Sequence, residues 1–375
     1  MTGAALEREI RARLATGRYA LVGAGQLGEM SIDQWPAGVP LPRFFLDSFR
    51  RGQCRGIDVH PLQEHRADPS LTYLLSAFKM SAADARGIFE RLGQPRVLTV
   101  YDLFEHYSPR RFSNGWRRLD PDAATLAALE RVRACLADDT SRRVLDATLA
   151  WRYRRELIDD CPVEPEDDKY GLAKYGRGGR HYDLVYDGGA YDLSLAGKLL
   201  DAGASFARYV AFEPDPASLA RCASLAPAMA QRTGVAPVLE PLALSDHAGE
   251  ERFLANGLMS ARLVDGTGDS TADAVRVRTD RLDRYHREHF AHEKVSDVLV
   301  KLHVEGAEPA ALRGASGLIG TCVPDLFVNL SHDEASLLEV PPMLADTGRY
   351  AVHLRAHSLF GEGVTLFACA RPAAA

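Results

Sequence analysis

The stretch VYDGGAYD, residues 185–192, begins in an apolar run of β-type residues and ends in a glycine turn before a helical segment. Gly188, Gly189 and Ala190 leave room for a tight turn and for a ligand close to the backbone, directly after Asp187. This pattern of strand, turn and helix is typical of an α/β domain that binds its ligand at the carboxyl ends of parallel strands.

A second strand end follows in AFEPDP, residues 211–216. Glu213 ends this strand, where a carboxylate can accept hydrogen bonds from both hydroxyls of a ribose. Pro214 and Pro216 stop the strand and favour the start of the next helix. A third apolar run ends in KLHVEGAE, residues 301–308, so three strand ends predict one site for a nucleoside ligand.

Composition excludes several classes of protein. The 375 residues are 46% hydrophobic and 26% charged, which is enough material for two or three cores. The formal net charge of −6 argues against a dedicated nucleic-acid surface. Six dispersed cysteines without a CxxC pair favour a reducing compartment over a disulfide framework or a zinc site. The charged N-terminal segment resembles no signal peptide and no apolar run is long enough to cross a membrane, so we expect a cytoplasmic protein.

Three zones differ in their sequence pattern. Residues 1–112 alternate short apolar runs, the last of them RVLTVY at 96–101, with helical or turn-rich segments and predict a small Rossmann-like α/β domain. Residues 113–165 show helical spacing and then an acidic, proline-bearing stretch, which predicts a helical bridge and a linker. From 166 to 375 strands and helices alternate again. The last two apolar runs, YAVHLRAH and GVTLFACAR, predict an antiparallel hairpin at a sheet edge.

The second half of the chain resembles the FkbM-type methyltransferases. The motifs that carry this resemblance, in the family's order and spacing, are DGGAYD (187–192), EPDP (213–216), ALSD (243–246) and KLHVEGAE (301–308). LFVNLSHDEASLLEVPPML and LRAHS resemble the end of the same family, and YALVGAGQLG resembles the branch with an additional N-terminal Rossmann-like domain. The resemblance implies a class I fold that binds S-adenosylmethionine (SAM), with a mostly parallel seven-stranded sheet and an antiparallel edge hairpin.

The resemblance also implies where SAM lies. It places Asp187 and Gly189 beside the methionine part, Glu213 beside the ribose, and Ser245 and Asp246 beside the adenine. The complete cofactor-binding set that it implies is Asp187, Gly188, Gly189, Ala190, Glu213, Pro214, Ser245, Asp246 and Lys301.

Polar residues after two further strands are candidates for catalysis. Methyl transfer needs an acceptor atom held about 3 Å from the methyl carbon and a group that takes the acceptor's proton. His303, Glu305 and His332 are predicted to fill these roles. His303 replaces the family's aspartate, so it is either an acquired base or a mark of changed chemistry. Leu193 replaces an expected glycine and could crowd or shift SAM.

Other polar residues have competing interpretations. His332 and Asp333, with His303 and Glu305, offer enough nitrogen and oxygen ligands for a divalent metal, but Asp333 is expected to cap the next helix and no metal is predicted. His357 and Glu362 border the last loop and are further candidates for the acceptor pocket. The histidines of YHREHFAHEK, residues 285–294, are expected on a solvated helix face.

The first domain has a fingerprint of its own. GAGQLG, residues 23–28, follows the run YALV and opens a helix, and Asp47 ends the next strand. Gly23, Gly25, Gly28 and Asp47 therefore match the dinucleotide-binding pattern and predict a second nucleotide site, or an inherited scaffold without a ligand.

These patterns together predict a SAM-dependent methyltransferase that acts on a hydroxyl of a small or sugar-like metabolite. We expect no nucleic-acid or membrane partner, and the sequence is compatible with a homodimer. Two alternatives remain: an NAD(P)- or sugar-nucleotide-dependent enzyme that uses the GAGQLG loop, and a catalytically altered SAM-domain binding protein. The polar strand ends all lie after residue 185, which favours the methyltransferase.

Overall fold

A computed structural model describes residues 3–77, 80–108, 112, 116–118, 120–164, 179–254, 262–263, 274–358 and 363–370. The chain forms two compact units. The first comprises Met1–Asp122, Asp146–Cys161 and Ser358–Glu362, and the second comprises Ala123–Leu145, Pro162–His357 and Gly363–Ala375. The segment 113–165 therefore contributes to both units.

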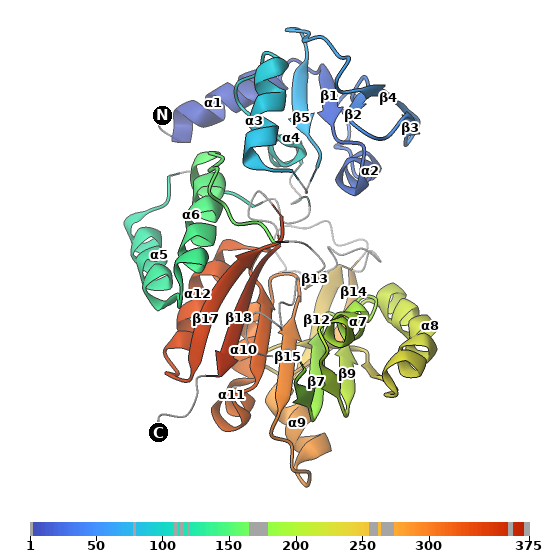
Figure 1. Ribbon diagram of the computed structural model, residues 1–375, viewed down its shortest axis with the longest axis vertical. Coiled ribbons are helices and arrows are strands. Elements are labelled where there is room, and N and C mark those ends of the chain that lie inside the picture. The colour runs from blue at the N-terminus through green and yellow to red at the C-terminus, as the bar shows by residue number, and fades with distance from the viewer. Residues whose placement is uncertain are drawn as a thin grey trace. The chain divides into compact units, whose positions relative to one another are not determined.

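The first unit is built on a five-stranded sheet in the order β3-β4-β2-β1-β5 (Figure 1). Its strands are β1 (Tyr19–Val22), β2 (Phe45–Asp47), β3 (Gly52–Cys54), β4 (Ile57–Pro61) and β5 (Thr72–Leu75), and its helices include α1 (Gly3–Leu14), α2 (Gln26–Asp33), α3 (Ala82–Arg91) and α4 (Val100–Tyr107). All pairings are parallel except the edge pair of β3 and β4. The central strand β1 is buried along its whole length, as a parallel strand covered on both faces should be. The predicted Rossmann-like domain is confirmed as a small, mostly parallel α/β sheet.

The apolar run RVLTVY is not the strand that its composition predicts. Only Thr99 forms an isolated parallel bridge, to Leu75, and α4 begins at the next residue. The Thr99 hydroxyl and backbone amide both bond to the side chain of Asp102 in a capping box, which starts a helix at Val100.

The helical spacing after residue 120 is confirmed by two helices, α5 (Ala123–Cys135) and α6 (Asp139–Arg154). Within the second unit, α5 packs against α12 (Glu334–Ala345). The predicted linker lies partly outside the described residues, because the description stops at 164 and resumes at 179. No helix in the described part of the chain is long and apolar enough to cross a membrane.

The second unit contains a seven-stranded sheet in the order β10-β9-β7-β15-β16-β18-β17. These strands are β7 (Leu184–Gly188), β9 (Tyr209–Phe212), β10 (Val238–Glu240), β15 (Val298–Leu302), β16 (Asp325–Asn329), β17 (Tyr350–Ala356) and β18 (Val364–Ala370). The helices of this unit besides α5 and α12 are α7 (Ser194–Asp201), α8 (Pro216–Thr233), α9 (Leu282–Phe290), α10 (Glu308–Gly314) and α11 (Ser316–Cys322). A short pair, β6 (His181–Tyr182) and β8 (Ser205–Phe206), lies outside the main sheet.

The direction of the strands decides where the site lies. β10, β9, β7, β15 and β16 are parallel, whereas β18 runs antiparallel to β16 and β17 runs antiparallel to β18. The predicted seven-stranded sheet with its antiparallel edge hairpin is thus confirmed, and Figure 1 shows this hairpin in red at one edge. The carboxyl ends of β9, β7, β15 and β16 meet at one edge of the sheet, where α/β proteins bind their ligands.

One predicted strand is divided between two sheets. The run PVLEPLAL is interrupted at Pro241, which has no amide hydrogen for a ladder. Residues before it form β10, and residues after it form β11 (Leu242–Leu244), which pairs with β14 (Ala274–Asp280). β11 and β14 belong to a four-stranded sheet that also contains β12 (Gly249–Leu254) and β13 (Arg262–Leu263).

Candidate active site

The turn after β7 requires glycine at one position. Gly189 has a φ of 71°, and a Cβ atom there would overlap the carbonyl oxygen of His303. The backbone that follows β7 therefore lies directly against the backbone that follows β15. This contact brings the predicted SAM turn and the predicted acceptor residues together at adjacent strand ends.

A buried ion pair holds the backbone carbonyls of this turn. Asp187 is 1% exposed, and its Oδ1 lies 2.8 Å from Nζ of Lys301. The Lys301 ammonium also donates to the carbonyl oxygens of Gly188 and Gly189, at 3.2 and 2.6 Å. The Tyr209 hydroxyl donates to Oδ2 of Asp187. Lys301 thus holds the two carbonyls of the turn, and Asp187, itself bound by Tyr209, holds Lys301. The predicted contacts of Asp187 and Lys301 with the cofactor stay predictions.

Glu213 lies at the end of β9, beside the same turn. Its carboxylate accepts hydrogen bonds from the backbone amides of Tyr191 and Asp215, at 2.9 and 3.0 Å. Burial raises the pKa of the Glu213 carboxyl above its usual value, and the two amides oppose this only in part. Ala190 is buried beside it. The expected strand stop and helix start are confirmed, because α8 begins at Pro216.

Ser245 and Asp246 follow β11. Ser245 is buried, and its backbone carbonyl leaves no room for a side chain at Gly314. The Asp246 carboxylate is bound by His247 Nδ1 and Arg313 Nε, both at 3.0 Å, and these two contacts lower its pKa. Their predicted contact with adenine stays a prediction.

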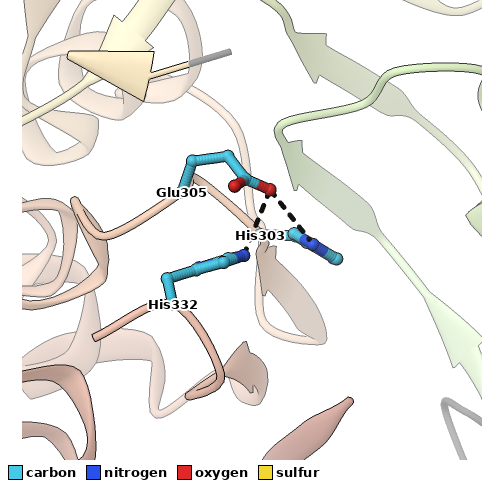
Figure 2. Close-up of side chains that lie close together, drawn as sticks. All are labelled: His303, Glu305 and His332. Atoms are coloured by element: carbon cyan, nitrogen blue, oxygen red, sulfur yellow. Dashed lines mark ion pairs between the residues drawn. The ribbon is translucent and has the colours of Figure 1, made fainter. Parts of the chain in front are cut away.

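The three candidate catalytic side chains converge from two turns (Figure 2). Nε2 of His303 and Nε2 of His332 lie 3.5 and 3.1 Å from Oε1 of Glu305. His303 and Glu305 follow β15, and His332 follows β16. His332 is 4% exposed, while His303 and Glu305 are partly accessible. The structure therefore brings together the three residues that the sequence singled out.

The electrostatics of this cluster depend on a fourth residue, Glu308, which is the last residue of the KLHVEGAE motif. Glu308 at the start of α10 is fully buried, and its Oε1 lies 2.6 Å from Nδ1 of His332. Burial lowers the pKa of His332, but Glu305 and Glu308 outweigh burial and raise that pKa above its usual value. Burial likewise raises the pKa of Glu305, but His332 and His303 outweigh it and hold that pKa below its usual range. The motifs HVEGAE and SHDE can both be recognised in the sequence. The contact between Glu308 and His332, however, depends on the adjacency of β15 and β16.

Comparison with known proteins identifies the domain that carries these strand ends. Residues 187–350 match the methyltransferase FkbM domain. This chain carries an FkbM methyltransferase domain. The predicted resemblance is confirmed for these residues, and the domain implies a SAM-dependent methyltransferase.

A solved structure shows the same fold along the whole chain. The crystal structure of methyltransferase FkbM from Methylobacillus flagellatus KT is 17% identical, covers 98% of this chain and 93% of that chain, and superposes with a TM-score of 0.64. No curated protein sequence matches the chain. The fold of the FkbM domain and of the additional N-terminal unit is therefore shared with that structure.

Leu193 does not line the turn of the FkbM domain. Its φ is 58°, and its side chain is 4% exposed and packs in the core with Leu195, Leu199 and Phe206. A residue that might have crowded SAM fills the space under α7 instead. Glycine there would relax the backbone but remove apolar packing.

The remaining candidates have structural partners. Asp333 caps α12 as expected, because its Oδ1 accepts a hydrogen bond of 2.7 Å from the amide of Ser336. His357 is buried, and Glu362 lies outside the described residues. The expectation of a solvated histidine face on α9 is wrong for His286, which is half-buried with Nδ1 2.8 Å from the hydroxyl of Tyr186. That contact needs β7 and α9 to meet, which the helical spacing alone does not show.

The glycine loop of the first unit has the geometry of its fingerprint. Gly23 has a φ of 108°, and a Cβ on Gly28 would lie 2.6 Å from the carbonyl oxygen of Gly23. A Cβ on Gly25 would meet nothing within 4 Å. Asp47 accepts hydrogen bonds of 2.8 Å from the amide of Ala24 at one carboxylate oxygen and, at the other, from the amides of Phe49 and Arg50. The carboxylate that completes the dinucleotide-binding pattern therefore holds the loop itself.

Proposed function

We propose that this FkbM-domain enzyme transfers the methyl group of SAM to a hydroxyl oxygen of a small or sugar-like metabolite. The observation that supports this most is the contact of Gly189 with the His303 carbonyl, because it sets the SAM turn next to a cluster of polar side chains. In the transfer, the bond from carbon to the acceptor oxygen forms as the bond from carbon to sulfur breaks, and the hydroxyl proton leaves. Imidazoles and carboxylates are groups that orient a hydroxyl through hydrogen bonds.

Charge supports a small acceptor over a macromolecule. The formal net charge of −6 gives no general attraction to nucleic acid. All six cysteines are free, which fits an enzyme of the reducing cytoplasm.

The experiment is to incubate the protein with SAM that carries a deuterated methyl group and a panel of sugars, polyols and phenols. Mass spectrometry should find a deuterated methyl ether, and label on nitrogen or carbon alone would contradict the proposal.

Glu213 is the proposed ribose contact, and its removal should weaken SAM binding. Glu213→Ala removes a carboxylate that can make two charge-assisted hydrogen bonds, which should cost about 2–3 kcal/mol, or roughly 30- to 150-fold in affinity. Calorimetric titration with S-adenosylhomocysteine measures the change. Glu288→Gln, an exposed position on α9, is the control and should bind as the native protein does. Unchanged affinity in the Glu213 variant would rule out this assignment.

We infer that the first unit is a scaffold and not a second nucleotide site. Both Asp47 oxygens hold backbone amides, and the Arg50 guanidinium bonds to the Ala24 carbonyl and to Glu29, each at 2.6 Å. Since a Cβ at Gly25 would meet nothing within 4 Å, Gly25→Val should preserve the fold and block only a ligand. Methyl transfer and SAM affinity should stay within about twofold of native. Tight NAD binding that Gly25→Val abolishes would contradict the scaffold role.

A further inference from the structure

The side chains of His303, Glu305 and His332 come closer to one another than hydrogen bonding to a single hydroxyl requires. One ligand atom from each residue can be chosen so that all three lie within 4.8 Å of one another. Figure 2 shows both rings directed toward the same Glu305 oxygen, and the ring centroids of the two histidines are 5.0 Å apart. Two imidazoles and one carboxylate on a common centre form a typical set of metal ligands.

We propose that His303, Glu305 and His332 bind a divalent first-row transition-metal ion. Metal–nitrogen and metal–oxygen distances of about 2.0–2.2 Å place neighbouring ligand atoms roughly 3.0–3.4 Å apart in octahedral or tetrahedral sites. The two nitrogens lie 3.1 and 3.5 Å from Oε1 of Glu305. An ion fits after small movements of the side chains.

A second layer of contacts orients the ligands. Glu308 accepts from Nδ1 of His332, which directs Nε2 of that ring toward Glu305. Glu308 is itself fixed by the backbone amides of Val304 and Gly306, each at 2.9 Å. A carboxylate on the outer nitrogen of a ligating imidazole is a recurring feature of metal sites.

The backbone supports the same interpretation. Glu305 has a φ of 56°, in the left-handed region that a non-glycine residue seldom adopts. Gly306 follows with a φ of 102°, and its amide bonds to Glu308. Strained residues of this kind concentrate at functional sites, where the surrounding structure holds them. Here the strained residue carries the carboxylate that both histidines face.

Charge and ligand type indicate which ion is suited. Glu308 is buried and Glu305 is partly accessible, and a divalent cation would balance both carboxylates. Imidazole nitrogen favours zinc, copper, cobalt, nickel or iron over magnesium, calcium and manganese, which prefer oxygen ligands.

The ion would define the class of acceptor, a step that rests on the proposed function. Three protein ligands leave at least one coordination position for an acceptor hydroxyl, and a neighbouring oxygen on the acceptor could fill another. A metal-bound hydroxyl is more acidic, so its proton passes to solvent and the resulting alkoxide attacks the methyl carbon of SAM. The products are the methyl ether, S-adenosylhomocysteine and one proton. The favoured acceptors are compounds with adjacent oxygen donors, such as vicinal diols.

The test is titration of the chelator-treated full chain with Co²⁺ alone, followed by calorimetry and by visible absorption. We expect one ion per chain, with the absorption bands of a site that includes nitrogen ligands. His303→Ala, Glu305→Gln and His332→Gln should each weaken binding at least about 100-fold. His303→Asp keeps a ligand atom and should retain one ion with a shifted preference toward Mn²⁺. His289→Gln, an exposed imidazole on α9, is the matched control and should bind as the native chain does.

Two results would overturn the metal site: no saturable binding by the native chain, or binding that the three ligand variants leave unchanged. Circular dichroism of each variant separates loss of a metal ligand from loss of the fold. If His332→Gln unfolds, His303→Asp still tests the site through its expected shift in metal preference. SAM titration of the metal-free chain distinguishes the two proposals. SAM binding without any metal site would leave the methyltransferase proposal intact and remove only this inference.

Discussion

Replacement of Gly189 by alanine is expected to abolish SAM binding and to destabilise the second unit. The residue has a φ of 71°, and an added Cβ would overlap the carbonyl oxygen of His303. The left-handed conformation alone costs a residue with a side chain about 1–2 kcal/mol, and relief of the overlap must separate the ends of β7 and β15. We expect SAM affinity to fall by more than about 100-fold, because 1.4 kcal/mol corresponds to tenfold and the cofactor turn itself moves.

Calorimetry with S-adenosylhomocysteine and thermal unfolding measure these two effects. Gly320→Ala on α11 is the control, since a Cβ there meets nothing within 4 Å and alanine favours a helix. It should leave affinity unchanged and raise the midpoint of unfolding slightly. If Gly189→Ala binds SAM as tightly as the native chain, the turn after β7 is not the cofactor site.

Loss of the His303 side chain should affect turnover far more than cofactor binding. The backbone carbonyl of His303 meets the Gly189 turn, and its ring lies toward Glu305, where we propose that the acceptor binds. Removal of one group that stabilises charge in a transition state costs roughly 10²- to 10³-fold in kcat. His303→Ala should therefore slow methyl transfer by that order, while SAM affinity stays within a few fold.

His303→Asp is the matched variant because it restores the residue that the FkbM-type motif carries. We expect it to retain most of the turnover, within about tenfold, since a carboxylate can still hold the acceptor or an ion. Steady-state assays of labelled methyl transfer give kcat and KM for both variants. If His303→Ala changes nothing and His303→Asp raises activity, the histidine marks chemistry that has changed, and the binding-protein alternative moves ahead.

The positions of the site residues could be predicted because parallel strands bring their carboxyl ends to one edge. VYDGG, AFEP and KLHVEG each end an apolar run, so Asp187, Glu213 and His303 were assigned to that edge without knowledge of the strand order. The convergence of His332 with Glu305 needs in addition that β16 is the neighbour of β15, which the structure shows. Polar residues at the end of each apolar run thus predict which side chains lie at the edge of the sheet where the site is.

Contacts between distant segments could not be predicted in the same way. The bond from Tyr209 to Asp187 depends on the register of β9 against β7, and the burial of Glu308 depends on how α10 starts beneath His332. The departure of β11 to a second sheet follows from Pro241, but its partner β14 lies about thirty residues further along the chain. Leu193 was assigned to the ligand side because its position in the motif gave no information on which way its side chain points.

Calorimetric titration of the native chain, first with SAM and then with NAD, tests the central claim most directly. The account predicts one SAM per chain, displaced by S-adenosylhomocysteine, and no heat from NAD, because the FkbM domain implies SAM as its cofactor and the carboxylate of Asp47 is held by backbone amides. Binding of NAD without any binding of SAM would contradict the account and move the functional site to the first unit.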